Sequence, residues 1–447
     1  MSGVSDLTAR RLDVLLAREQ HDGRLPSVVG GVVRDGELVW TGAVGGVDAV
    51  TPGPDVQYRI GSITKTLVAL AVLQLRDEGA LDLNDRLDVH LPGIRYGDRT
   101  LRGLLSHGTG MHSEPAGSWW ERTPGGTFDE LAAGLSEDDA PFVPGATFHY
   151  TNVAFGLLGE VVSRHRGAPW FDVVRERVLE PLGMTRTSYL PEAPHASGFS
   201  VHHYAGTLTA EPSCDAGAMA PAGQVWSTIR DLARYAAFLA VGDARVIAPA
   251  TIAEMCIPQS GSRASALTNA HGLGIALTRG GSGMLVGHTG SMPGFLAGCY
   301  ADPIRRTAAV VMANATVGMR CEGLVVDLLE TLEESEGTVP VPWCPSRDVP
   351  ASVLEILGVW HWGNTALSFA WDEKWLVVSN PVRRAESHRF VPEEGGTFLG
   401  TRGYHNGERL HVVRNDDGSI NHLVCETFVY TRTPYDPDAP IPGGHPR

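Results

Sequence analysis

Lysine is almost missing from this sequence of 447 residues. Of the 36 lysines and arginines only two, Lys65 and Lys374, are lysine. Arginine keeps its proton in proteins, whereas a buried lysine can lose it, so a cationic side chain that must act as a base can only be one of these two. The surroundings of Lys65 are therefore the first place to look for chemistry.

Long apolar runs are also missing. No stretch reaches the length of a membrane-spanning helix, and residues 1–26 lack the continuous apolar core of a signal peptide. A net charge of −15 argues against nucleic acid and anionic membrane surfaces as partners. We therefore expect a cytoplasmic protein without nucleic-acid or membrane partners.

Cysteine occurs six times but never as a C-x-x-C pair, and no histidines cluster at the spacing of zinc ligands. We interpret the cysteines as reduced structural thiols. Accordingly we expect neither a metal nor another cofactor.

The stretch Gly61-Ser62-Ile63-Thr64-Lys65 leads into the apolar run 66–75, which predicts a buried helix that begins near Ser62. Three residues of helix place the Lys65 amine on the same side as the Ser62 hydroxyl. The helix end stabilises negative charge on the serine oxygen, and burial favours a neutral amine that can accept the serine proton. A Ser-x-x-Lys pattern is weak by itself, and the alternative is a capping serine beside a solvated lysine.

The chain predicts an α/β domain over residues 1–338, in which strands from both ends form a sheet around an inserted helical block. An Asp35-Gly36 turn indicates a hairpin near the start. Later strands are expected near 272–277, 284–287, 294–301 and 308–314. A proline-rich stretch at 339–351 has the composition of a linker.

The residue pattern changes after this linker. Residues 352–433 contain short alternating strands, such as 409–414 and 421–431, which are separated by turn residues. They predict an antiparallel β domain, a small barrel. The tail 434–447 is rich in proline and glycine and is expected to be loose.

Two further stretches strengthen the case for Ser62. Tyr150 and Asn152 are two residues apart at a predicted junction of loop and helix. His288-Thr289-Gly290-Ser291 lies on a predicted strand, where glycine lets a substrate backbone come close. Each has a structural alternative, a core tyrosine or a strand histidine, but the three motifs together indicate a catalytic constellation.

The order Ser-x-x-Lys, Tyr-x-Asn, His-Thr-Gly resembles that of the serine penicillin-binding proteins and class C β-lactamases, a superfamily that includes esterases and D-aminopeptidases. The stretches 104–111, 180–184 and 222–228 are also similar to it. The resemblance spans about residues 7–332. It implies a β-lactamase/penicillin-binding-protein-like fold: an antiparallel sheet flanked by helices, with a helical subdomain.

The resemblance also implies a role for each matching residue. Ser62 would be the nucleophile and Lys65 the base that activates it. Tyr150, deprotonated by its neighbours, would shuttle protons to the leaving group and from the attacking group. Asn152 would hold the substrate amide, and the backbone N–H groups of Ser62 and Ser291 would form the oxyanion hole.

His288 is a departure from the β-lactamase pattern, since many β-lactamases and transpeptidases have lysine at this position. A histidine that is largely neutral at pH 7 attracts a substrate carboxylate less strongly. This disfavours β-lactam hydrolysis and suits esters, thioesters or amides. Thr289 and Gly290 beside it are expected to line the substrate site.

The predicted layout, a catalytic domain followed by a lipocalin-like β domain, resembles stand-alone penicillin-binding-protein-type thioesterases that release and cyclise nonribosomal peptides. Ser62 would then accept a peptidyl thioester, carried on a carrier protein, through a C-terminal D residue, and the peptide's own amine would attack. The alternatives are a D-stereospecific peptidase or aminopeptidase, an esterase, and a non-catalytic sensor.

Specificity in this interpretation would lie in two loops. Trp119 and Trp120 belong to one, and His203, beside His202, belongs to the other. The alternative for both loops is ordinary packing.

Overall fold

The computed structural model forms two compact units, Met1–Thr338 and Val339–Arg447. The described residues are 3–46, 51–136, 140–261, 268–281, 283–337, 342–346, 348–372, 374–382, 385–434, 436 and 438. Parts of the predicted linker and tail, residues 339–341, 347, 435, 437 and 439–447, lie outside this set. No described helix is both long enough and apolar enough to span a bilayer.

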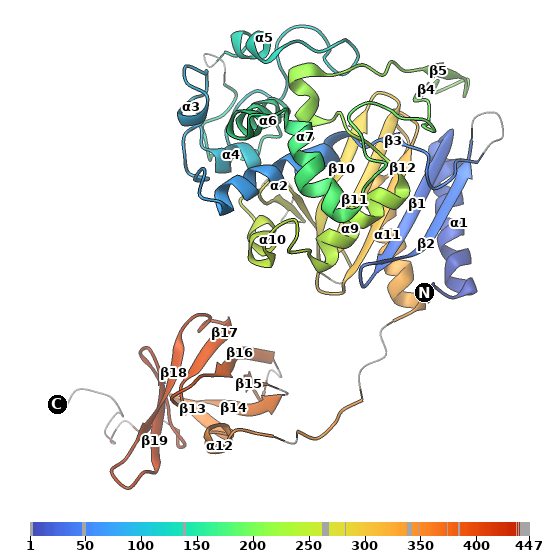
Figure 1. Ribbon diagram of the computed structural model, residues 1–447. Coiled ribbons are helices and arrows are strands. Elements are labelled where there is room, and N and C mark those ends of the chain that lie inside the picture. The colour runs from blue at the N-terminus through green and yellow to red at the C-terminus, as the bar shows by residue number, and fades with distance from the viewer. Residues whose placement is uncertain are drawn as a thin grey trace. The chain divides into compact units, whose positions relative to one another are not determined.

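The first unit is built on an eight-stranded, fully antiparallel sheet with the order β2-β1-β12-β11-β10-β9-β8-β7 (Figure 1). Its strands are β1 (Ser27–Arg34), β2 (Glu37–Gly45), β7 (Ser260–Gly261), β8 (Asn269–His271), β9 (Ala276–Arg279), β10 (Met284–Met292), β11 (Phe295–Asp302) and β12 (Thr307–Ala313). Two small pairs are β3 (Tyr58–Arg59) with β6 (Trp226–Ser227) and β4 (Phe199–Val201) with β5 (Leu208–Ala210). Both ends of the unit thus contribute to one sheet, as the sequence predicts.

Helices cover both faces of this sheet. The helices of the first unit are α1 (Asp6–Gly23), α2 (Thr64–Asp77), α3 (Leu87–His90), α4 (Leu101–Leu105), α5 (Phe128–Ala133), α6 (Val153–Arg166), α7 (Trp170–Val174), α8 (Glu180–Leu182), α9 (Ile229–Val241), α10 (Pro249–Met255) and α11 (Cys321–Ser335). Helices α1 and α11 pack on one face of the sheet and α9 packs on the other. Side chains of β1 alternate between two cores: Val28 and Val32 pack with α1 and α11, and Val29 and Val33 face the core that holds α2 and α9. Because both faces are buried, β1, β11 and β12 are almost continuously apolar.

The hairpin predicted at Asp35-Gly36 is confirmed, with φ of 50° and 84° at these two residues. The single strand predicted at 272–277 is wrong. Gly272 begins a turn, closed by its N–H donating to the Ile275 carbonyl, that joins β8 to β9.

The second unit is an antiparallel sheet of eight strands in sequential order, preceded by the short helix α12 (Ala351–Leu354). The strands are β13 (Gly358–Trp362), β14 (Thr365–Asp372), β15 (Trp375–Asn380), β16 (Ala385–Pro392), β17 (Phe398–Gly403), β18 (Arg409–Arg414), β19 (Ile420–Cys425) and β20 (Phe428–Tyr430). His361 and Thr431 exchange two backbone hydrogen bonds, so the first strand meets the chain after the last and the sheet forms a nearly closed barrel. The strand predicted over 421–431 is two strands.

Candidate active site

Ser62 lies in a 3₁₀ turn, Gly61–Ile63, that runs directly into α2. The residues of α2 from Thr64 to Leu75 are all buried, whereas the Ser62 side chain is partly exposed. The turn therefore presents one reachable hydroxyl at the positive end of a buried helix, where negative charge on oxygen is stabilised.

Lys65 is fully buried, at 0% exposure, and its amine faces this hydroxyl. The Nζ atom lies 2.9 Å from Ser62 Oγ and donates to the Ala222 carbonyl at 2.6 Å. The capping alternative, in which Lys65 is solvated, does not hold in the structure.

Burial lowers the pKa of Lys65 to about 7, although the negative charges of Glu114 and Glu121 oppose the shift. An amine with this pKa is unprotonated in a large fraction of molecules near neutral pH. Lys65 can therefore accept the Ser62 proton, which an ordinary surface lysine cannot do.

Tyr150 belongs to the same group. Its ring centroid is 5.0 Å from Lys65 Nζ, and its hydroxyl is buried. Burial raises the pKa of Tyr150, and the charge of Glu114 raises it further, while the Ser62 side chain acts in the opposite direction. The expectation that its neighbours deprotonate Tyr150 is therefore wrong for the resting site: its hydroxyl keeps the proton and can donate it.

Asn152 lies directly before α6, next to a carboxylate that the sequence analysis did not single out. The Asn152 Nδ2 atom donates to Glu114 Oε1 at 2.6 Å, and Trp120 Nε1 donates to Glu114 Oε2 at 2.7 Å. Glu114 is nevertheless exposed. Asn152 and Trp120 thus fix a negative charge beside the catalytic group, and Glu121 adds a second charge that acts on Lys65.

Residues 288–291 of strand β10 lie against the 3₁₀ turn that contains Ser62. A Cβ atom added at Gly61, whose φ is 54°, would lie 2.5 Å from the Ser291 nitrogen. A Cβ atom at Gly290 would lie 1.9 Å from the Ile60 carbonyl oxygen. Only glycine fits at both positions, and the close approach places the Ser62 and Ser291 N–H groups on adjoining backbone, as an oxyanion hole requires.

His288 is buried and neutral. Burial lowers its pKa to about 4, and the charge of Lys65 also lowers it. The Nδ1–H group donates to the Thr289 carbonyl at 2.5 Å. An uncharged side chain at this position agrees with the expectation that carboxylate recognition is weak here.

The structure does not bring every predicted residue to this group. Trp119 is 60% exposed and lies on the Arg122 guanidinium, 3.9 Å from its carbon to the ring centroid. His203 lies in an exposed turn between β4 and β5, where its carbonyl accepts a hydrogen bond from Arg24. The substrate-binding role predicted for His203 has no support in this placement.

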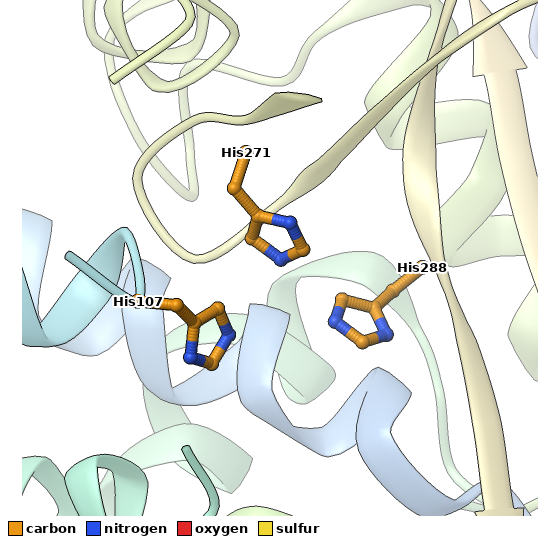
Figure 2. A group of neighbouring side chains, drawn as sticks. All are labelled: His107, His271 and His288. Carbon is orange, nitrogen blue, oxygen red and sulfur yellow. The ribbon is translucent and has the colours of Figure 1, made fainter. Parts of the chain in front are cut away.

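Two clusters of side chains have nitrogen, sulfur or oxygen atoms close enough together for a metal ion. One is His107, His271 and His288 (Figure 2), and the other is His405, Glu408 and Cys425 in the second unit. The three histidines come from separate segments, and the second cluster has only one histidine, so the spacing of histidines in the sequence could not show either cluster. His107 does lie in one of the stretches that carry the family resemblance.

The family model described as Beta-lactamase matches residues 12–328, and a domain of unknown function, DUF7586, matches residues 349–432. Beta-lactamase-like protein 2 of Dictyostelium discoideum is 26% identical over 269 residues, 56% of this chain and 49% of that protein. The chain thus spans about half the length of this relative.

Two solved structures show the same fold. A D-stereospecific amidohydrolase from Streptomyces sp. is 27% identical, with a TM-score of 0.60 over 74% of this chain and 98% of its own. SurE is 23% identical, with a TM-score of 0.59 over 96% of this chain and 99% of its own.

Proposed function

The chain belongs to the beta-lactamase family of serine hydrolases, and from this premise we propose that it transfers acyl groups through an ester of Ser62, with D-configured aminoacyl amides as its substrates. The observation that carries the proposal is the buried Lys65 amine, 2.9 Å from Ser62 Oγ, with its pKa lowered to about 7. It supplies the base that a serine nucleophile needs.

Acylation follows from this geometry. Ser62 Oγ attacks the substrate carbonyl while its proton passes to Lys65, and the N–H groups of Ser62 and Ser291 stabilise the resulting oxyanion. Collapse of the tetrahedral intermediate breaks the amide bond. Tyr150, which holds its proton, donates it to the departing amine and regains one from Lys65.

Glu114 supports an amine-bearing substrate. Each of its oxygens accepts one hydrogen bond, and each keeps a lone pair for a ligand. A carboxylate that is held in place yet exposed suits the α-ammonium group of an amino-acid amide. The D configuration is proposed from the likeness to the Streptomyces amidohydrolase.

Macrocyclisation of a peptidyl thioester with a C-terminal D residue is the second candidate. The fold likeness to SurE, one structure of which holds D-Leu, extends over 96% of this chain and so includes the β domain. In this case the carrier-bound peptide is the acyl donor, and its own N-terminal amine is the acceptor.

A panel of substrates separates the candidates. We would compare D- and L-aminoacyl anilides, their N-acetyl derivatives, and peptidyl thioesters with either C-terminal epimer, with mass analysis of the products. The proposal expects hydrolysis of the D-aminoacyl anilides, no turnover by Ser62→Ala, and a raised KM in Glu114→Gln for the free-amine substrates only. A cyclic product formed only from the D-epimer thioesters would favour the cyclase. If a fluorophosphonate does not label Ser62, the remaining alternative is the non-catalytic sensor.

A further inference from the structure

Three imidazole rings converge beside the catalytic group. His107 follows α4, His271 ends β8 and His288 lies in β10, and their exposures are 0%, 7% and 4%. One ring nitrogen of each lies within 4.8 Å of the others, and Figure 2 shows the rings directed toward a common point. The Nε2 atoms of all three make no hydrogen bond within the described part of the chain. Buried nitrogens in this state are costly unless a ligand pairs with them.

The backbone fixes which Nε2 atoms carry hydrogen. The Thr151 N–H group donates to His107 Nδ1 at 3.1 Å, so in the neutral His107 ring the proton is on Nε2. His288 has the opposite tautomer, because its Nδ1–H group donates to the Thr289 carbonyl at 2.5 Å and leaves a lone pair on Nε2. The cluster therefore offers at least one donor and one acceptor, and His271 can supply either.

The tautomer of His107 argues against a metal ion at this cluster. Burial lowers the pKa of each ring, so all three rings are neutral near pH 7. A divalent cation would find a proton on His107 Nε2, where it needs a lone pair.

A neutral oxygen atom fits the mixture of donor and acceptor nitrogens in this cluster. A water molecule can accept from His107 Nε2–H and donate to His288 and His271, and it keeps one lone pair. A small alcohol can make two of these hydrogen bonds.

The cluster also has a cavity beside it. A space of about 310 Å³ is lined by residues that include His271, His288, Tyr150, Phe148 and Glu322. The Tyr150 ring stacks on His107 at 4.2 Å between ring centroids, with an angle of 29° between the planes. An oxygen held by the three Nε2 atoms would therefore lie beside the side chains that move protons to and from Ser62.

We propose that His107, His271 and His288 bind the acyl acceptor, a water molecule or a small neutral alcohol, for the second half of the reaction. This inference rests on the proposed acyl-enzyme. The acceptor oxygen attacks the carbonyl of the Ser62 ester, and its proton passes to Lys65. The C–O bond to Ser62 then breaks as Ser62 Oγ takes this proton from Lys65, which returns to the neutral amine. The products are the free acid, or a new ester, and the resting serine.

This site would give the enzyme a preference among acceptors. The three neutral rings provide no negative charge to attract an ammonium ion, whereas Glu114 provides one for the acyl donor. Glu322 also lines the cavity, but its two oxygens accept hydrogen bonds from the hydroxyls of Thr278 and Tyr300. The acceptor site thus selects neutral oxygen nucleophiles, and hydrolysis or alcohol transfer should exceed amine transfer.

His271 gives the sharpest test, because it has no role in the proposed acylation. We would measure the burst and the steady state with a D-aminoacyl nitrophenyl ester, for the wild type, His271→Phe and His271→Gln. We expect acylation of His271→Phe within about threefold of wild type, and deacylation slowed about tenfold or more, with the acyl-enzyme visible by intact mass. His271→Gln retains a polar group and should recover part of the rate. Circular dichroism of each variant controls for folding.

Methanol provides a second measurement, on the unmodified enzyme. The wild type should give more methyl ester relative to acid than the uncatalysed ester does at the same methanol concentration, and His271→Phe should lose this preference. Unchanged deacylation in His271→Phe, or a wild-type ratio equal to the uncatalysed one, would overturn the inference. A visible tetrahedral Co²⁺ spectrum in the wild type that His271→Phe lacks would replace it with a metal site. Failure of the proposed acyl-enzyme can be distinguished from failure of this inference, because a fluorophosphonate would then not label Ser62.

Discussion

Each unit has, among its described residues, one cluster of side chains with close ligand atoms: three histidines in the first unit, and His405 with Glu408 and Cys425 in the second. The two clusters differ in what their histidine nitrogens do. In the first unit, the Nε2 atoms of His107, His271 and His288 have no hydrogen-bond partner among the described residues. In the second unit, His405 Nδ1 lies 2.6 Å from Glu408 Oε2, and His405 Nε2 lies 2.9 Å from the Tyr430 hydroxyl. Both nitrogens of His405 are therefore paired.

This difference separates a structural cluster from a ligand site more clearly than burial does. A histidine such as His405, with both ring nitrogens paired, has no capacity left for a ligand and contributes to the stability of the core. Buried nitrogens without partners destabilise the resting protein, so a functional role explains their presence better than a structural role does. Substitutions in the two units should accordingly affect different quantities: reaction rates in the first and unfolding in the second.

The largest expected effect comes from Lys65→Arg. Arginine keeps the positive charge but cannot release its proton, so acylation should fall by about 10⁴-fold or more, as far as with Lys65→Ala. The rate of fluorophosphonate labelling of Ser62 measures this step directly.

The second unit supplies the matched control. Lys374 is the other lysine of the sequence and lies 5.1 Å from the Trp375 ring centroid. Lys374→Arg should leave labelling unchanged. An active Lys65→Arg enzyme would mean that Lys65 provides only charge and that the base is elsewhere.

His405→Ala should affect stability alone. His405 is fully buried at 0% exposure, and its removal leaves a cavity and unpairs the Tyr430 hydroxyl. We expect the second unit to lose about 2–4 kcal/mol of its free energy of unfolding. Urea unfolding followed by tryptophan fluorescence measures this loss, and Ser62 labelling should not change. A slowed acylation would refute the division of roles between the two clusters.

A smaller change should follow from pH. The pKa of Lys65 is lowered to about 7, and only the neutral amine accepts the serine proton. Below this value acylation should fall about tenfold for each pH unit, and above it the rate should level off. The pH profile of kcat/KM with a D-aminoacyl anilide tests this sign. A plateau that extends to pH 5 would exclude Lys65 as the base, and Lys374→Arg should reproduce the wild-type profile.

The sequence predicted the parts of the site that lie along one segment. Ser62 and Lys65 are three residues apart on a buried helix, so composition and helical period were sufficient to bring them together. The apolar strands of the sheet could also be predicted, because each strand is a single apolar segment of the sequence. Contacts between distant segments were not: Glu114 meets Asn152 across 38 residues, and the three histidines meet across β8, β10 and the loop after α4.

Protonation states could not be predicted from the sequence either, because they depend on burial in the folded protein. The proton on Tyr150 follows from burial of its hydroxyl, which no local pattern records. The substrate-binding role of His203 stays a prediction: a pair of neighbouring histidines suggested it, and the fold places His203 in an exposed turn beside Arg24. Local patterns were therefore sufficient to bring Ser62 and Lys65 together, and tertiary contacts determined the rest of the candidate site.

The smallest effect should come from separating the two units. Among the described residues, the two apolar cores of the first unit contain residues from Val4 to Leu332, and the core of the second contains residues from Val349 to Tyr430, so these residues share no core cluster. A chain ending near residue 338 should therefore fold by itself and keep Ser62 labelling within about twofold of the full protein. The comparison also separates the two candidate functions. An amidohydrolase whose donor and acceptor sites both lie in the first unit keeps its product ratio after truncation, because Glu114 and the three histidines remain. A shift from cyclic to linear product in the truncated enzyme would instead assign the β domain a part in selecting the acceptor.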